Sequence, residues 1–262
     1  NPVSRARLRR EADLRRAVET TEFRLLYQPK LELSTGRIIG AEALIRWERE
    51  RGEIVSPMDF IPVAEETGLI LEIGERVLGE ACRQLARWRE EGIDLRVSVN
   101  ISALQFFEGD LLAQVTSALA EAGLEPESLI LEVTESILMD RVDQAVDTLF
   151  QLRKLGLGIS IDDFGTGYSS LSYLKRFDVD EVKIDRSFVI DVGRSREDRA
   201  LITAVTYLSH KLGARVCAEG VEDAAQLKFL NKVKCDEYQG YFCSRPVSPG
   251  ALVDLVRTVN KK

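Results

Sequence analysis

The sequence predicts an α/β fold, a closed (β/α)8 barrel, on the basis of three observations. Eight short, apolar and mostly β-branched runs recur along the chain, and longer amphipathic stretches separate most of them. Strand and helix in alternation are typical of a parallel sheet. The length of 262 residues suits a single barrel. An open, doubly wound sheet is the alternative, but the sequence lacks the glycine-rich dinucleotide-binding fingerprint that would favour it.

The eight predicted strands correspond to the apolar runs. In chain order they cover residues 24–33, 37–47, 95–102, 128–135, 157–164, 180–185, 214–221 and 235–242. The first two are joined by the short turn "ELSTGR", which leaves no room for a helix. Because strands joined by a tight turn run antiparallel, we expect the first strand pair to be an antiparallel hairpin.

The predicted helices lie between the later strands. Residues 75–92 space apolar side chains along one helical face and end at Gly92, a helix stop. Residues 111–123 and 145–156 repeat this pattern, and each also ends at a glycine. We expect these helices to cover the outside of the barrel with their apolar faces turned inward.

The first residues differ in character from the rest. The chain opens on "NPVSRARLRREADLRRAVE", a mixed basic and acidic stretch without an initiator Met. We interpret residues 1–22 as a linker helix from an upstream domain and residues 23–262 as the barrel. A processed natural terminus is the alternative interpretation.

The composition narrows the possible chemistry. The net charge of −7 argues against a general electrostatic grip on DNA or RNA. No apolar run reaches the ~20 residues that span a bilayer. The four cysteines show no metal-finger spacing and are expected to be free thiols in a reducing cytoplasm. His210 is the sole histidine, which excludes multi-histidine zinc sites.

Polar side chains occupy the strand face that should point into the barrel. Alternate residues of a strand share a face, and several runs carry one apolar and one polar face. The inward polar positions are Glu42, Arg46, Asn100, Glu132, Asp162, Lys183, Glu219 and Gln239. Several intervals between them are about 30 to 36 residues, the length of one strand–helix unit. Most lie at the carboxyl ends of strands, where barrel active sites are built.

This convergence predicts a metal site. Five carboxylates, with Asp163 beside Asp162, would crowd one rim against the fixed charges of Lys183 and Arg46. Like charges at this range would force protonation unless a cation intervenes. Oxygen ligands without His or Cys select hard ions, Mg²⁺ or Mn²⁺. Both aspartates can reach the site only if the strand ends there, and such a pair can bridge two metals about 4 Å apart, as in phosphoryl hydrolysis.

Eight short motifs occur along the chain in order. They are "YQP" (27–29), "AEALIRW" (41–47), "NIS" (100–102), "EVTE" (132–135), "DDFGTGYSSL" (162–171), "KID" (183–185), "EGVE" (219–222) and "QGY" (239–241). As a set they resemble the EAL domains, bacterial phosphodiesterases for cyclic di-GMP. The resemblance runs from about Phe23 to Pro249, and the name-giving triplet is Glu42-Ala43-Leu44.

The resemblance implies a fold and an activity. The fold is a modified (β/α)8 TIM-like barrel with an antiparallel first strand pair. The activity is hydrolysis of one phosphodiester bond of cyclic di-GMP to linear pGpG with two Mg²⁺ or Mn²⁺ ions, and Ca²⁺ is expected to be non-productive. A catalytically silent cyclic di-GMP-binding sensor is the alternative. An inert dimerisation scaffold would leave the inward-facing acids without a role.

The resemblance also assigns roles by motif. The metal ligands would be Glu42, Asn100, Glu132, Asp162, Asp163 and Glu219. Lys183 would be catalytic, holding or polarising the attacking water with Asp185 behind it, and Glu219 would be a ligand or the general base. The substrate would contact Gln28, Glu42, Arg46, Asn100, Lys183 and Gln239. Glu135 would anchor the loop 162–171.

Simpler interpretations of single residues stay open beside these roles. Asp163 can be a plain turn former, and Glu135 can merely occupy the first turn of a helix. Lys183 can be a snorkelling surface lysine, and Arg46 can pair with a surface glutamate.

Partners follow from the resemblance as well. They are cyclic di-GMP, a second copy of the chain bound through the region around the loop 162–171, and an upstream sensory or GGDEF-type domain; DNA and RNA are not expected. The chain would be a cytoplasmic domain of a bacterial signalling protein, with membrane anchoring of that protein left open.

Overall fold

The strands form a closed barrel. The computed structural model describes residues 2–20, 22–49, 52–166 and 171–261. Its strands are β1 (Phe23–Glu32), β2 (Ile38–Glu48), β3 (Ile54–Val55), β4 (Arg96–Asn100), β5 (Leu129–Thr134), β6 (Gly158–Phe164), β7 (Glu181–Ile184), β8 (Arg215–Ala218) and β9 (Glu237–Tyr238). The barrel order is β1–β9–β8–β7–β6–β5–β4–β2, and β2 pairs with β1 to close it. The two-residue β3, which the sequence did not predict, pairs with the end of β2.

The strand directions confirm the predicted topology. β1 runs antiparallel to β2, with Gln28 opposite Glu42, and it is also antiparallel to β9. The remaining barrel neighbours, from β2 through β4 to β9, are parallel. The (β/α)8 barrel and its antiparallel first pair are therefore confirmed.

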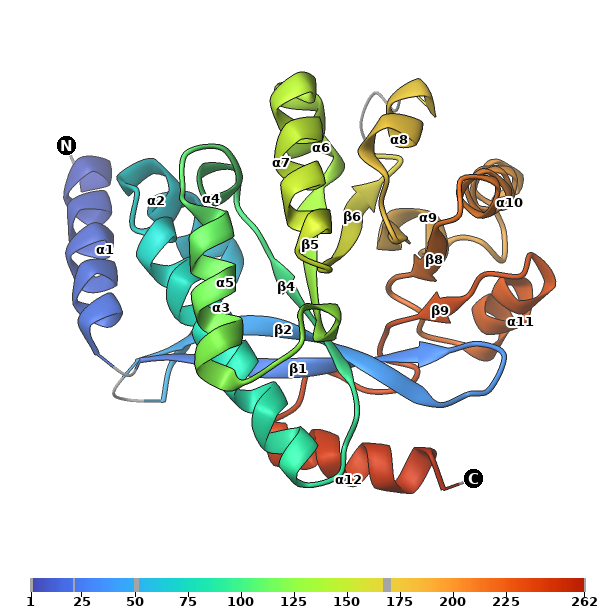
Figure 1. Ribbon diagram of the computed structural model, residues 1–262, viewed down its shortest axis with the longest axis horizontal. Coiled ribbons are helices and arrows are strands. Elements are labelled where there is room, and N and C mark those ends of the chain that lie inside the picture. Colours follow the sequence, from blue (N-terminus) through green and yellow to red (C-terminus); the bar gives the residue numbers. More distant parts are fainter. Residues whose placement is uncertain (1, 21, 50–51, 167–170, 262) are drawn as a thin grey trace.

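Helices cover the strands from outside (Figure 1). They are α1 (Pro2–Glu19), α2 (Pro57–Thr67), α3 (Ile70–Glu90), α4 (Ala103–Phe107), α5 (Leu111–Ala122), α6 (Glu135–Asp140), α7 (Val142–Lys154), α8 (Leu171–Phe177), α9 (Arg186–Ile190), α10 (Arg196–Lys211), α11 (Ala224–Lys232) and α12 (Pro249–Val259). The three predicted helices correspond to α3, α5 and α7. Gly123 ends α5 in the left-handed conformation, with φ of 64°.

Three short helices begin directly at the carboxyl ends of strands. α4, α6 and α9 are N-capped by Ser102, Thr134 and Asp185, whose side-chain oxygens accept backbone N–H groups of the first helical turn. The rim at this end of the barrel is therefore built from strand ends and short, capped helices.

The hydrophobic core has two parts. The larger part lies between the strands and the covering helices. A smaller cluster packs Leu14, Ala17 and Val18 of α1 against Trp47 and Phe60. Thus α1, which lies within the predicted linker segment 1–22, rests on the barrel, and its connection to an upstream domain stays a prediction.

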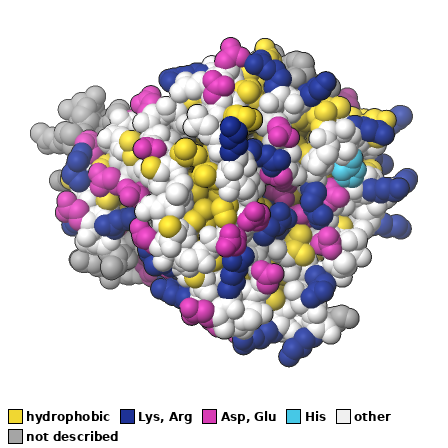
Figure 2. All heavy atoms as spheres, in the orientation of Figure 1, with side chains coloured by type: hydrophobic (Ala, Val, Ile, Leu, Met, Phe, Trp, Pro, Cys, Tyr) yellow, Lys and Arg dark blue, Asp and Glu magenta, His cyan; other side chains and the backbone are white. Residues whose placement is uncertain are grey.

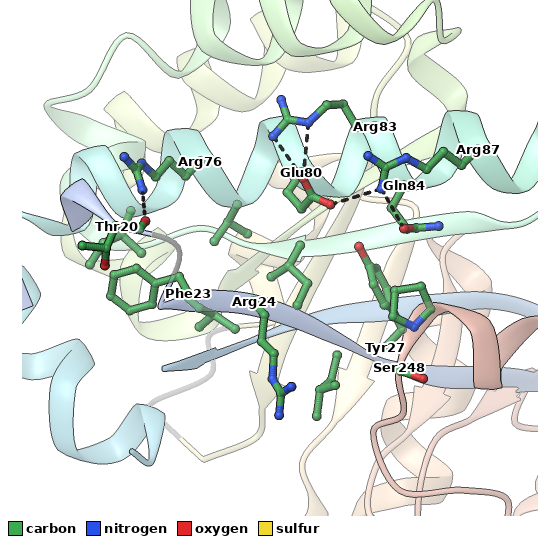
Figure 3. A pocket seen from close by; sticks show the side chains of 16 residues that line it. Thr20, Phe23, Arg24, Tyr27, Arg76, Glu80, Arg83, Gln84, Arg87 and Ser248 are labelled. Carbon is green, nitrogen blue, oxygen red and sulfur yellow. Dashed lines mark hydrogen bonds and ion pairs between the residues drawn. The ribbon is translucent and has the colours of Figure 1, made fainter. Parts of the chain in front are cut away.

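The β1–β2 hairpin leaves part of the barrel wall without a helix of its own. A cavity of about 570 Å³ lies there between β1 and α3 (Figure 3). Its floor is apolar, with Phe23 and Tyr27, while Arg76 and Arg83 of α3 line its rim. None of the predicted site residues lines this cavity.

The surface agrees with the modest net charge. Figure 2 shows basic and acidic side chains intermixed over one face of the molecule. No helix among the described residues is both long enough and apolar enough to cross a membrane.

Candidate active site

A buried lysine at one end of the barrel contacts carboxylates from three strands and from the residue that follows β8. In β7, Val182 and Ile184 point away from the barrel axis, into the core beneath the helices. Lys183 therefore points into the barrel, where it is fully buried. Its Nζ lies 2.6 Å from Glu132 Oε2 and 2.6 Å from Glu219 Oε1. Glu42 Oε2 and Asp162 Oδ1 each lie 3.4 Å away. The surface interpretation of Lys183 is therefore wrong.

The adjacent aspartates reach the same site through an irregularity in β6. β6 continues through both aspartates to Phe164, the last residue of the predicted strand 157–164, so the condition that the strand end at the aspartate pair is not met. Its pairing with β7 shifts register between Ile161 and Phe164, and Asp163 has a φ of 54°. Asp tolerates this left-handed conformation better than most residues do. The backbone turn lets Asp163 face the site instead of alternating away from it.

Asp162, Asp163 and Glu219 form a group suited to a metal ion. Each offers one carboxylate oxygen, and these oxygens all lie within 4.8 Å of one another. An all-oxygen donor set fits hard divalent cations. The donor chemistry of this rim therefore fits the predicted ions.

The electrostatics of the rim point the same way. Burial raises the pKa of Glu219 to about 8, although the contact with Lys183 lowers it. Burial and the neighbouring Asp162 also raise the pKa of Asp163. Burial alone would lower the pKa of Lys183, but the surrounding carboxylates raise it well above its ordinary value. The single positive charge of Lys183 thus faces four carboxylates and cannot neutralise all of them. A divalent cation would compensate the remaining negative charge.

Amide side chains hold Glu42 from both sides. Asn100 Nδ2 donates to Glu42 Oε1 at 2.6 Å, and Gln239 Nε2 donates to Glu42 Oε2 at 2.7 Å. Gln239 Nε2 also donates to Gln28 Oε1 at 2.9 Å, which links the "YQP" and "QGY" motifs. The buried Gln239 Oε1 has no hydrogen-bond partner among the described residues. It is free to accept from a ligand.

Two cavities flank the carboxylates, and Leu44 lines both. The larger, about 420 Å³, is mostly apolar and includes Arg46 and Asn100 in its wall. The smaller, about 190 Å³, is lined by Gln28, Glu42, Glu219 and Gln239. Cavities on both sides of a polar cluster suit a ligand that has two bulky ends.

Glu135 connects the site to the loop that follows β6. It is the first residue of α6 and is buried, and its Oε2 accepts the backbone N–H of Gly165 at 3.1 Å. Glu135 thus lies at a helix start and also bonds to the backbone after β6, and its role as the anchor of the loop 162–171 stays a prediction. Residues 167–170 of the predicted loop 162–171 lie outside the described residues. Asp185, expected behind Lys183, caps α9 by accepting the Ser187 N–H at 3.0 Å.

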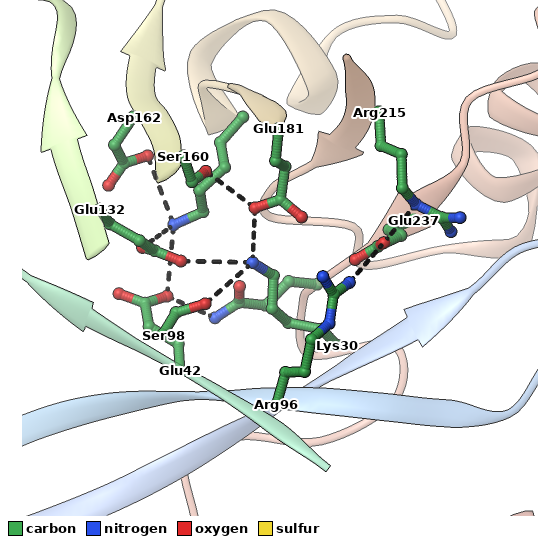
Figure 4. Close-up of polar contacts among 12 residues, drawn as sticks. Lys30, Glu42, Arg96, Ser98, Glu132, Ser160, Asp162, Glu181, Arg215 and Glu237 are labelled. Atoms are coloured by element: carbon green, nitrogen blue, oxygen red, sulfur yellow. Dashed lines mark hydrogen bonds and ion pairs between the residues drawn. The ribbon is translucent and has the colours of Figure 1, made fainter. Parts of the chain in front are cut away.

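A second polar layer, which was not predicted from the sequence, lies below the rim (Figure 4). It contains Lys30, Ser98, Ser160, Glu181 and Glu237, all of them buried. The strand parity that selected the rim residues also applies here. Lys30 shares a strand face with Gln28, and Ser160 shares one with Asp162.

Comparisons with known proteins agree with this geometry. Residues 11–246 match the family model described as the EAL domain. The chain is 46% identical over 245 residues to the bifunctional diguanylate cyclase/cyclic di-GMP phosphodiesterase MucR of Pseudomonas aeruginosa, covering 93% of this chain and 36% of that protein. It is 42% identical over 251 residues to the cyclic di-GMP phosphodiesterase NbdA of the same species, covering 95% and 32%. The chain thus spans about a third of the length of these relatives.

A solved structure supports the relationship. The complex described as PaMucR phosphodiesterase with c-di-GMP superposes with a TM-score of 0.90 at 46% identity, over 93% of this chain and 99% of that one. The family-model match over residues 11–246 includes the barrel strands and the motifs whose side chains meet at the rim. The chain belongs to the EAL domain family.

Proposed function

We propose that this chain is a metal-dependent phosphodiesterase that hydrolyses one phosphodiester bond of cyclic di-GMP to linear pGpG. The observation that carries the proposal is the convergence of Glu42, Glu132, Asp162 and Glu219 on Lys183 at the barrel rim. Relatives that are 46% and 42% identical are named as cyclic di-GMP phosphodiesterases. Hydrolysis of this messenger would lower its level in the cell.

Two Mg²⁺ or Mn²⁺ ions are the proposed cofactors. Glu42, Asn100, Glu132, Asp162, Asp163 and Glu219 would hold them. The proximity of three carboxylates within 4.8 Å supports this set. When bound, such ions supply Lewis-acid stabilisation of a phosphodiester and help to activate water.

The chain's own residues would bind and orient the substrate. Gln28, Arg46 and Gln239, with Glu42, Asn100 and Lys183, are the proposed contacts. The cavities of about 420 and 190 Å³ would each receive one guanine-bearing half, which places the phosphodiester between them at the carboxylates. Gln239 Oε1, unpartnered among the described residues, would accept a hydrogen bond from the ligand.

Lys183 and Glu219 are the proposed catalytic residues. Lys183 would orient the attacking water with its ammonium group, and Glu219 would accept the proton from that water or ligate a metal. Attack in line on phosphorus breaks the bond to the ribose oxygen, which leaves and takes up a proton. Glu135 would hold the loop after β6 in place through Gly165 N–H.

Incubation with cyclic di-GMP tests the proposal. Product formation is followed by chromatography with Mg²⁺, with Mn²⁺, with Ca²⁺ and with a chelator. Metal-dependent pGpG is expected with Mg²⁺ or Mn²⁺ and not with Ca²⁺. Tight binding of intact cyclic di-GMP without cleavage under every condition would instead identify the alternative, a silent sensor.

The wider context of the chain is also a proposal. Because it spans about a third of its relatives, we propose that it works in the cytoplasm as one domain of a multi-domain signalling protein. Residues 1–22 would link it to an upstream sensory or GGDEF-type domain. We further propose a homodimer through the region around the loop 162–171, which light scattering of the purified chain with and without cyclic di-GMP would test.

A further inference from the structure

Lys30 is a buried cation that the proposed mechanism does not use. It lies in β1, near the middle of the barrel interior, and its ammonium reaches across to the walls formed by β4, β5 and β7 (Figure 4). Lys30 Nζ donates to Ser98 Oγ at 3.2 Å, to Glu132 Oε1 at 3.2 Å and to Glu181 Oε1 at 2.6 Å. An ammonium has three N–H donors, so each donor has an acceptor and the group is held in one orientation.

The two carboxylate oxygens of Glu132 bond to different lysines. Oε1 accepts from Lys30, while Oε2 accepts from Lys183 at 2.6 Å and faces the rim. Glu132 is itself buried, and it belongs to the proposed metal ligands. A carboxylate held at one oxygen presents the other in a defined direction, and such supporting bonds to metal ligands tune metal affinity.

A purely structural role would explain only part of this arrangement. Lys30 neutralises Glu181, which also accepts from Ser160 Oγ at 2.8 Å. Neutralising Glu181 does not require a contact with Glu132, which already has Lys183 as its partner. The shared position between Glu132 and Glu181 makes Lys30 a physical connection between the lower layer and the rim.

We propose that Lys30 is a positioning residue for the metal site: it holds Glu132 Oε1 away from the rim, so that Oε2 alone is presented to a bound ion. This inference rests on the proposed function, because it takes Glu132 as a metal ligand. Lys30 contacts neither substrate nor metal in this arrangement and acts through Glu132.

The test separates positioning from charge balance. Glu181→Gln removes one buried negative charge, and Lys30→Met combined with Glu181→Gln removes one charge of each sign. The single variant keeps the Lys30–Glu132 contact and is the matched control. Mn²⁺ binding to each folded protein is measured by isothermal titration calorimetry without nucleotide, and folding is followed by circular dichroism.

The expected result is a loss of Mn²⁺ affinity specific to Lys30. Relative to Glu181→Gln, the double variant should bind Mn²⁺ about 10- to 100-fold more weakly, the usual effect of removing a partner of a metal ligand. Lys30→Gln on the same background offers a neutral donor to Glu132 and should recover part of this loss.

Two outcomes would overturn the proposal. One is a double variant that folds and binds Mn²⁺ as tightly as the Glu181→Gln control. The other is failure of both double variants to fold, which would assign Lys30 to the stability of the barrel. Hydrolysis by the wild-type protein is assayed separately. If the variants show that Mn²⁺ binding depends on Lys30 but the wild-type protein leaves cyclic di-GMP intact, the result contradicts the proposed function and not this inference.

Discussion

The rim and the lower layer of the barrel interior both combine buried cations with carboxylates, but they differ in charge balance. At the rim, Lys183 faces Glu42, Glu132, Asp162 and Glu219. Below it, cations meet carboxylates in closer balance: Lys30 contacts Glu181 at 2.6 Å, and Arg215 contacts Glu237 at 2.8 Å. The rim carries an excess of negative charge, and the lower layer carries much less.

Two glutamates that lie 2.6 Å from Lys183 and Lys30 respectively, Glu219 and Glu181, show the consequence. Burial raises the pKa of Glu219 at the rim to about 8. Burial acts in the same direction on Glu181, but Lys30 outweighs it and the pKa falls to about 2. Glu181, Cys217 and Glu237 also each offer one potential ligand atom, and these atoms lie within 4.8 Å of one another. Because Lys30 and Arg215 already bond to the two carboxylates, we interpret this lower group as structural and the rim as the cation site.

The largest expected effect is on turnover. Asp162→Asn or Glu42→Ala should reduce kcat for cyclic di-GMP by at least about 10³-fold, because a bound metal contributes several kcal/mol to the transition state. The barrel should remain folded, since both residues lie at the rim. Steady-state kinetics and circular dichroism check both statements, and a rate close to wild type in either variant would contradict the metal assignment.

The next effect contrasts the two buried lysines. Lys183→Met and Lys30→Met each leave buried carboxylates without a partner, so each should lower the unfolding free energy by about 3–5 kcal/mol. Mg²⁺ should restore much of the loss in Lys183→Met, because an ion can replace the ammonium at the rim. It should restore little in Lys30→Met. Denaturant unfolding with Mg²⁺ and with chelator measures this, and equal rescue of both variants would break the distinction between the layers.

Divalent ions should also stabilise the wild-type protein. A ligand that binds only the folded state at 100 times its Kd adds about 2.7 kcal/mol. For a protein of this size, 1 kcal/mol corresponds to a rise in Tm of about 2–4 °C. Thermal unfolding with Mn²⁺ should show this rise, and Asp162→Asn should abolish most of it. An unchanged Tm in the wild type would contradict a metal site at the rim.

The smallest effect concerns pH and the lower layer. Burial, with Glu181 nearby, raises the pKa of Glu237 to about 7 from 4.5. Between about pH 4.5 and 7 the carboxyl group of Glu237 is protonated in the folded state and ionised in the unfolded state. Its contribution to the free energy of unfolding therefore falls as pH rises through this range. Glu237→Gln should reduce this decline. Unfolding free energies measured across the window test it, and an identical slope in the variant would argue against the raised pKa.

Much of the rim could be predicted from strand parity. Asn100, Glu132 and Lys183 each stand opposite an apolar strand face, and the structure turns them inward as expected. The same rule places Ser160 on the polar face of its strand with Asp162, and applied to Lys30 it would have indicated the lower layer. These residues carried no motif, and a lysine or serine in a strand is common on surfaces, so the parity signal alone did not single them out.

Other features could not be predicted from sequence. Asp163 faces the site because β6 shifts register against β7 and turns through a left-handed residue. Such an irregularity depends on how neighbouring strands pair, which local sequence does not encode. The short helices α4, α6 and α9 were missed for a related reason. Each has five or six residues, too few for a periodic pattern to emerge.

The sequence by itself determined the eight strands of the barrel, the hairpin at the start, and which side chains of the regular strands point inward, because alternation along a regular strand depends only on position. The tertiary structure decided which of those groups touch. Contacts across a barrel depend on the stagger between strands that are distant in the chain. Only the folded chain could therefore reveal that Glu132 is shared between Lys183 above and Lys30 below.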